Sequence, residues 1–235
     1  MAKATYPVTE LFHSIQGEGL NVGRSAWFVR LAGCNYSCPG CDEPLHDQPK
    51  KSKKMTAEEI AQALTTPADL VVITGGEPAM YDLTPMIQAI REMAHAWPVM
   101  KIHPASGQVG VGPLICIETN GSLSISEDID FICVSPKPVV YAKDKKNGDY
   151  NLDTLERADE IKMVVGWTEG TKEAVEERLD YFCSINPMAQ LFLSPLTQFP
   201  GNTLIPEWTE KTVELVKAFP GVRLSLQTHK WLNIR

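Results

Sequence analysis

Three cysteines, Cys34, Cys38 and Cys41, stand with three and then two residues between them, just after the apolar run Trp27–Leu31. Three thiolates so close in sequence can hold a metal ion or an iron–sulfur cluster. A four-iron four-sulfur cluster is usually held by four cysteines, so three ligands leave one iron open to a substrate or cofactor. The spacing therefore indicates a catalytic cluster.

Two other interpretations of these cysteines stay open at this point. Together with His46 they would make a Cys₃His zinc site, because the spacings lie in the range that such sites use. A disulfide fits less well, since clustered cysteines in a chain without a secretory signal favour metal or redox roles. The remaining cysteines, Cys116, Cys133 and Cys183, lie in apolar runs, where a free thiol packs in the core as a small hydrophobe.

Length and composition predict one domain over residues 1–235, since a chain with 43% hydrophobic residues is long enough for one large core. No run approaches the roughly 18 apolar residues of a membrane span, and the first residues lack a secretory signal. We therefore expect a cytoplasmic protein with no membrane partner. The net charge of −7 argues against a nucleic-acid partner, which needs clustered basic residues.

Apolar, β-rich runs recur along the chain, and most are too continuous to be half-exposed, which is typical of strands buried in a parallel sheet. The expected strands are Ala26–Leu31, Leu70–Thr74, Leu114–Glu118, Phe131–Val134, Ile161–Val165, Leu191–Leu193 and Val222–Leu226. Helical patterns lie between several of them. A capping box at Thr56 and Glu59 begins one helix, and others are expected from Thr84, from Thr171 and before Pro220.

Alternating strands and helices predict an α/β fold with right-handed crossovers. Between Val134 and Ile161 there is room for only one short helical turn, near Leu152–Arg157. A full eight-fold barrel typically needs about 250 residues. We therefore expect an incomplete barrel of the (βα)6 type with some helices short or missing. Lys101–Pro113 is expected to be a loop added before the third strand, with no role assigned.

Polar segments follow three of the expected strands, and in such folds chemistry gathers at the C-terminal strand ends. In Gly75–Pro78 two glycines let the backbone approach a ligand, and the Glu77 carboxylate can accept from an ammonium group. Thr119–Gly121 is a polar turn, and Ser135–Lys137 places a hydroxyl and a cation at the same rim. Taken alone, Gly75–Pro78 would also fit an ordinary turn.

These segments and the three cysteines together resemble the radical S-adenosylmethionine superfamily. The resemblance implies that Cys34, Cys38 and Cys41 hold a four-iron four-sulfur cluster whose open iron binds the amino and carboxylate groups of S-adenosylmethionine. It also implies that the Gly75–Pro78 turn meets the methionine amino group. An external electron donor such as flavodoxin would then start the cleavage of S-adenosylmethionine to a 5′-deoxyadenosyl radical.

Phe12–Gly19, Trp27–Cys34 and Leu226–Lys230 resemble one family more closely, 7-carboxy-7-deazaguanine synthase, and the similarity runs from Glu10 to the C-terminus. This family contracts 6-carboxy-5,6,7,8-tetrahydropterin to 7-carboxy-7-deazaguanine with loss of ammonia, a step toward queuosine and related deazapurines. The resemblance implies a homodimer, regenerated S-adenosylmethionine and an assisting Mg²⁺ ion. Two rival functions stay open, a radical enzyme that activates a partner protein and a non-catalytic zinc module.

The resemblance also implies two sets of binding residues. The substrate set is Ile15, Gln16, Gly17, Glu18, Arg30, Thr74, His229 and Arg235. The S-adenosylmethionine set is Gly40, Asp42, Gly76, Glu77, Asn120, Ser135, Pro136, Lys137 and Ser194.

The side-chain chemistry of the substrate set suits a pterin in its own right. Glu18 can accept from the donor-rich edge, Gln16 can match the amide-like face, and Arg30 can bind the carboxylate with two hydrogen bonds. Pairing of Arg30 with a surface acid is the alternative. Six residues follow His229, and we expect them to fold back and close the pocket at Arg235, against simple capping of the last strand.

The chain departs from the resembled family in two places. After the third cysteine that family usually has Asp-Thr, with the Thr oxygen on Mg²⁺, whereas this chain has Asp42-Glu43-Pro44. Glu43 is expected to replace that ligand, since a carboxylate oxygen suits Mg²⁺, and the alternative is that Glu43 faces solvent. After the sixth strand the family often has Gln-Pro, where this chain has Ser194-Pro195. The adenine contacts there are therefore expected to differ in detail.

Overall fold

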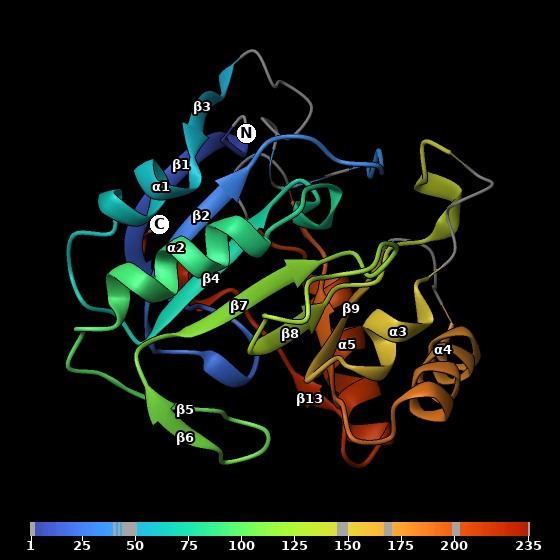
Figure 1. Cartoon of the computed structure of the whole chain (residues 1–235). Helices are drawn as coiled ribbons and strands as arrows, with labels where there is room; N and C mark the ends of the chain where they lie inside the picture. The colour runs from blue at the N-terminus through green and yellow to red at the C-terminus, as the bar shows by residue number, and fades with distance from the viewer. Residues whose placement is uncertain are drawn as a thin grey trace.

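The computed structural model describes residues 3–39, 41, 43, 51–144, 150–166, 171–198 and 203–234. Within these ranges nine strands form one mixed sheet, which Figure 1 shows running through the molecule. In sheet order they are β13 (Arg223–Leu224), β10 (Gln190–Pro195), β9 (Glu160–Val165), β8 (Phe131–Val134), β7 (Leu114–Thr119), β4 (Leu70–Gly75), β2 (Ser25–Leu31), β1 (Thr5–Ile15) and β3 (Lys53–Thr56).

The strands from β13 to β2 are parallel to their neighbours, and β1 and β3 extend one edge in antiparallel fashion. The first six predicted strands are thereby confirmed. The seventh run, Val222–Leu226, is shorter than predicted, since only Arg223 and Leu224 pair with β10. The prediction missed β1, because polar residues and Pro7 interrupt its apolar pattern. It also missed a hairpin, β5 (Met100–Ile102) with β6 (Val109–Val111), within the segment expected to be a loop.

The helices follow the predicted alternation, although α3 and α6 are short. They are α1 (Ala57–Ala63), α2 (Thr84–Ala94), α3 (Leu152–Glu156), α4 (Lys172–Ile185), α5 (Pro206–Ala218) and α6 (Thr228–Trp231). The capping box of α1 is confirmed, because the Thr56 side chain accepts from Glu59 N and the Glu59 carboxylate accepts from Thr56 N. At α2 the predicted cap is displaced by one residue, since Leu83 is the N-cap and Thr84 is already helical.

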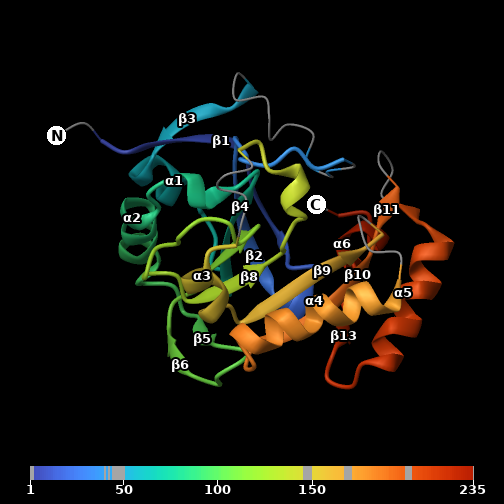
Figure 2. The same ribbon diagram turned by 90° about the vertical axis from the view of Figure 1, so that its right-hand side faces the viewer.

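The helices cover one face of the sheet. Ile60 of α1, Ile87 of α2 and Leu179 of α4 pack in one core cluster with strand residues such as Ile73 and Ile117. Figure 2 shows α2, α4 and α5 spread along the outside of the sheet. The alternate strand residues point to the other face, which we call the inner face. The result is an incomplete (βα)6-type barrel, as predicted.

The inner face changes character along the parallel strands. Near their beginnings it is apolar, with Phe28, Val72 and Cys116 in a second core cluster. Toward their C-terminal ends the same rows carry polar side chains such as Thr74 and Glu118, as the alternation of a strand requires. An apolar floor therefore supports a polar rim.

Of the three spare cysteines, Cys116 and Cys133 are buried, as predicted. The prediction is wrong for Cys183, which is exposed, because its neighbour Phe182 takes the inward position on α4. Within the described ranges no helix combines the length and the apolar character that crossing a membrane requires.

Candidate active site

A cavity of about 260 Å³ lies at the C-terminal ends of the parallel strands. It is walled by the loop after β1, by strand ends from β2 to β10 and by the C-terminal segment. From the predicted binding residues its lining includes Ile15, Gln16, Glu18, Arg30, Cys34, Cys38, Cys41, Glu43, Thr74, Gly76, Asn120, Ser135, Lys137, Ser194 and His229.

The remaining predicted residues divide into two groups. Gly17, Glu77 and Pro136 are described and do not line the cavity. Gly40, Asp42 and Arg235 lie outside the described residues. His46, which the zinc interpretation requires, also lies outside them.

The three motif cysteines share one part of the cavity wall and carry free thiols. Burial, with smaller contributions from the charges of Glu77, Cys38 and Cys41, raises the pKa of the Cys34 thiol to about 11, although the hydrogen bond from Tyr36 N opposes this shift. Burial also raises the pKa of Cys38, although the Lys137 ammonium opposes this. Thiols in such surroundings are deprotonated when a cationic metal centre binds them. The donor set therefore fits an iron–sulfur cluster held by three thiolates.

Amide and hydroxyl groups from the turn after β7 hold the cysteine loop. Asn120 Nδ2 donates to Asn35 Oδ1 at 2.9 Å, and Asn35 Nδ2 donates to Ser122 Oγ at 2.8 Å. On the other side, Ser37 N donates to the carbonyl of Tyr141 at 2.8 Å. Asn120, predicted to bind the cofactor, thus lies on the wall and also positions the loop that carries the cysteines.

The two glycines at the end of β4, Gly75 and Gly76, are required by close backbone packing. Gly75 has a φ of +134°, and a Cβ there would lie 2.1 Å from the Leu31 carbonyl oxygen. A Cβ at Gly76 would lie 2.0 Å from the Gly33 carbonyl oxygen. No other residue type fits these positions without moving backbone. The turn is therefore pressed against the start of the cysteine loop, and both glycines line the cavity.

Glu77 has a different place from the one predicted. Its carboxylate is fully buried and accepts from Thr119 Oγ1 at 2.7 Å, Asn120 N at 2.7 Å and Ala79 N at 2.9 Å. Burial raises the pKa of Glu77, and the hydrogen bonds oppose that shift. Glu77 thereby ties two strand-end turns together and does not line the cavity. Its predicted contact with a ligand ammonium group stays a prediction, since a carboxylate has about four acceptor sites and protein donors take three of them.

Arg30 of β2 lies between two carboxylates on the cavity wall. Its Nε is 3.1 Å from Glu10 Oε2 and 3.2 Å from Glu43 Oε2. The side chain of Glu43 is only 13% exposed, so the alternative that it faces solvent is wrong. The sequence left ligand binding and acid pairing open for Arg30, and the structure has the acid pairing with the guanidinium still at the cavity.

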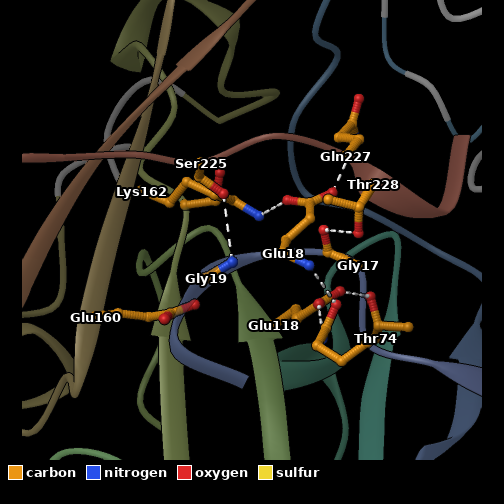
Figure 3. A network of polar contacts seen from close by, with 12 residues as sticks. Gly17, Glu18, Gly19, Thr74, Glu118, Glu160, Lys162, Ser225, Gln227 and Thr228 are labelled. Carbon is orange, nitrogen blue, oxygen red and sulfur yellow. Dashed lines mark hydrogen bonds and ion pairs between the residues drawn. The ribbon is translucent and has the colours of Figure 1, made fainter. Parts of the chain in front are cut away.

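Gln16 and Thr74, both predicted to bind substrate, meet at a residue that the prediction left out. Gln16 Nε2 donates to Glu118 Oε1 at 3.1 Å. Thr74 Oγ1 donates to Glu118 Oε2 at 2.7 Å (Figure 3). Glu118 lines the cavity from the inner face of β7. It ends an expected strand next to the polar turn Thr119–Gly121, and that position was the signal available in the sequence.

Glu18 is held by two further residues that sequence reasoning missed. Lys162 of β9 donates to Glu18 Oε2, and Gln227 Nε2 donates to Glu18 Oε1 at 2.9 Å (Figure 3). All three side chains line the cavity. Lys162 stands in the otherwise apolar run Ile161–Val165, and a cation in such a run needs a partner.

The loop after β1 packs against the C-terminal segment. A Cβ at Gly17 would lie 2.1 Å from His229 Nδ1, so the imidazole stacks where a side chain would otherwise be. Thr228 N donates to the Gly17 carbonyl at 3.0 Å. The described end of the chain turns back through α6, with Ile234 N donating to the His229 carbonyl at 3.1 Å. The predicted fold-back of its apolar side chains is wrong, since Trp231 and Leu232 are each 60% exposed.

Comparisons with known proteins agree with this site. A model of the Radical SAM superfamily matches residues 29–204. The chain is 34% identical to the 7-carboxy-7-deazaguanine synthase of Bacteroides thetaiotaomicron, over 97% of this chain and 98% of that protein. The chain belongs to the 7-carboxy-7-deazaguanine synthase family. Another member, from Synechocystis sp., is 32% identical over 98% of this chain and 94% of its own length.

A solved structure agrees with this membership of the 7-carboxy-7-deazaguanine synthase family. The crystal structure of QueE from Escherichia coli is 26% identical, with a TM-score of 0.70 over 95% of this chain and 94% of that one. The partial barrel and the cysteine loop are therefore features that this chain shares with radical S-adenosylmethionine enzymes. The zinc-module interpretation is not favoured.

Proposed function

We propose that this chain is a radical S-adenosylmethionine lyase that converts 6-carboxy-5,6,7,8-tetrahydropterin to 7-carboxy-7-deazaguanine and ammonia. One observation carries the proposal. A single cavity has the three motif thiols on its wall together with the Gln16–Glu18 loop and Arg30. Cofactor and substrate groups would then meet inside one enclosure at the strand ends, where this fold places its chemistry.

The cofactor supplies the radical chemistry, and the chain supplies binding and electrostatics. When bound through Cys34, Cys38 and Cys41, a four-iron four-sulfur cluster with S-adenosylmethionine would provide the 5′-deoxyadenosyl radical. The Gly75–Gly76 backbone, Ser135 and Ser194 line the cavity as groups able to contact S-adenosylmethionine.

Other groups of the same cavity suit the pterin. Arg30 presents a guanidinium for the pterin carboxylate, and Glu18 presents an acceptor for the aminopyrimidinone edge. Gln16, held by Glu118, offers its amide to the same ring. Phe12 and Phe28 stack with ring centroids 5.0 Å apart beneath them and line the cavity with apolar surface. The chain thereby orients the pterin and limits the water around it.

We propose that Mg²⁺ assists at Glu43. A carboxylate is an oxygen ligand that Mg²⁺ accepts, and the ion usually keeps several waters and binds through one or two carboxylates. Arg30, 3.2 Å from the Glu43 carboxylate, partly neutralises it and would compete with the ion for the same oxygen. The proposal therefore rests on the ligand chemistry of the Glu43 carboxylate, and a titration of the activity with Mg²⁺ tests it.

The finer properties are proposals of the same standing. We propose that residues 1–235 act as one radical S-adenosylmethionine domain, that the protein is a homodimer and cytoplasmic, and that an electron donor such as flavodoxin reduces the cluster. Free thiols suit a reducing compartment. No nucleic-acid or membrane partner is proposed, in line with the net charge of −7.

The experiment that tests the activity is anaerobic incubation with the carboxytetrahydropterin, S-adenosylmethionine and a strong chemical reductant, followed by mass analysis. The expected product is 7-carboxy-7-deazaguanine with one ammonia for each pterin consumed. The substrate and the two products balance without an oxidant, so the reductant serves only the cofactor. Protein that cleaves S-adenosylmethionine but leaves the pterin intact would overturn the proposal and favour another radical enzyme, such as an activase of a partner protein.

A further inference from the structure

A buried lysine faces the cavity from the middle of the sheet. Lys162 lies on the inner face of β9 between apolar neighbours and is only 9% exposed. Its ammonium donates to Glu18 Oε2, across 144 residues of sequence. Although burial lowers it, the neighbouring Glu18 carboxylate raises the pKa of Lys162 well above its ordinary value. The proposed chemistry leaves this lysine without a role.

The Glu18 carboxylate is held at both oxygens from two different elements. Lys162 of β9 donates to Oε2, and Gln227 Nε2 of the C-terminal segment donates to Oε1 at 2.9 Å. Gln227 is oriented in turn, since its Oε1 accepts from Lys230 Nζ at 2.5 Å. A carboxylate has about four acceptor sites, and this one lines the cavity.

The backbone of the Glu18 loop is fixed by contacts that do not involve Lys162. Thr228 N and Oγ1 both donate to the Gly17 carbonyl at 3.0 Å. Gly19 N donates to Ser225 Oγ at 3.3 Å (Figure 3). Leu20 N donates to a Glu160 carboxylate oxygen at 2.7 Å. The loop therefore has its own anchors. What Lys162 adds is the charge state and the direction of one carboxylate.

A purely stabilising role explains this arrangement poorly. A buried ion pair often contributes no more to stability than a well-packed apolar pair, because removing two charges from water is costly. Its better attested use is to fix one arrangement among several. Here the fixed group is the Glu18 carboxylate, which borders the cavity, so its orientation affects which ligands the cavity binds.

We propose that Lys162 and Gln227 are positioning residues that keep the Glu18 carboxylate ionised and turned to the cavity. The site thereby selects a heterocycle whose edge carries two adjacent N–H donors, as the 2-amino-4-oxopyrimidine edge of a pterin does. A 2,4-dioxo analogue places a carbonyl oxygen against the carboxylate and is rejected. This inference rests on the proposed function, because it concerns the pterin side of the same cavity.

The test measures binding and requires no turnover. The probes are 6-carboxypterin and 6-carboxylumazine, which differ only in the 2-amino group, titrated into anaerobic, cluster-loaded protein without reductant. For the wild type we expect 6-carboxypterin to bind at least about tenfold more tightly, the minimum for charge-assisted hydrogen bonds. Lys162→Met should reduce the preference to less than about threefold. Lys217→Met, on the exposed side of α5, is the matched control and should keep it.

Two readouts separate positioning from folding. Cluster absorbance and S-adenosylmethionine affinity should be unchanged in Lys162→Met, since a positioning role touches neither. Should that variant lose both, Gln227→Leu takes its place, and a preference reduced at least about threefold is expected, since one of the two bonds that orient Glu18 is lost. An unchanged preference in either folded variant overturns the inference while the proposed function stands. A wild type that binds neither probe and leaves the carboxytetrahydropterin unchanged contradicts the proposed function itself.

Discussion

The position of each cysteine side chain decides whether it can hold a cluster. Cys34, Cys38 and Cys41 border the cavity, whereas Cys183 is exposed on α4 outside it. We expect Cys38→Ala to abolish the cluster absorbance and all turnover, because one iron loses its protein ligand. Cys183→Ser is the matched control and should retain both. Full activity in Cys38→Ala would end the radical interpretation.

Glu43 stands where the family resemblance leads us to expect a threonine, and its role can be measured. If its carboxylate binds Mg²⁺, Glu43→Ala should weaken the rise in rate with Mg²⁺, seen as a several-fold increase in the Mg²⁺ concentration for half-maximal activity. The same variant removes one of the two carboxylates beside Arg30. Steady-state rates over a Mg²⁺ titration check this. A wild type whose rate is unaffected by thorough chelation has no metal role at Glu43.

At the scale of elements, the loop after β1 and the C-terminal segment should behave as one unit. A Cβ at Gly17 would occupy the place of the His229 ring. We expect Gly17→Ala to lower the melting temperature by several degrees, since about 1 kcal/mol shifts it by 2–4 °C in a chain of this size. In the His229→Ala background the same change should cost less, because the ring is gone and only the contact with the Cβ of residue 229, at 3.0 Å, remains. Equal costs in both backgrounds would contradict this packing.

The contact between that loop and β9 has a pH dependence of predictable sign. Burial raises the pKa of Glu160 even though Leu20 N donates to it. The carboxyl group of Glu160 thus binds its proton more tightly in the folded protein than in the unfolded chain. The stability that the protonated group contributes is complete below the unfolded pKa and is lost as pH rises through the folded pKa.

Glu160→Gln should remove that loss and keep an acceptor for Leu20 N. Relative to the wild type, the variant should therefore gain stability as pH rises from 5 to 8, by up to a few degrees in melting temperature. Thermal unfolding of the two proteins at both pH values checks this. If the melting temperature of the variant instead falls relative to the wild type as pH rises, the Glu160 charge is stabilising.

On the scale of the whole molecule, the sequence was informative where a pattern is local. Continuous apolar runs predicted six of the parallel strands of the described sheet, and the box at Thr56 predicted the start of α1. β1 was missed because its stability comes from pairing with β2 and β3 and not from its own apolar pattern. The hairpin within Lys101–Pro113 was missed for a related reason, since its turn residues look like a loop until the two short strands pair.

Many of the residues that line the cavity could be predicted from the sequence, but the residues that they contact could not. Motif spacing led to the cysteines, and the family resemblance led to Glu18 and Arg30. Strand alternation could have placed Glu118 and Lys162 on the inner face, yet their contacts with Gln16 and Glu18 join segments 102 and 144 residues apart. Such pairings depend on how the sheet curves, which no local pattern records. The donors to Glu77 were equally hard to predict, because they come from the end of a different strand.

The central claim is that one cavity holds cofactor and pterin side by side. An anaerobic crystal structure of the cluster-loaded protein with S-adenosylmethionine and the carboxytetrahydropterin tests it most directly. The account predicts S-adenosylmethionine against the cluster at Cys34, Cys38 and Cys41, and the pterin in the same enclosure with its amino edge at Glu18 and its carboxylate at Arg30. A pterin bound elsewhere on the molecule, or excluded whenever S-adenosylmethionine is present, would contradict it.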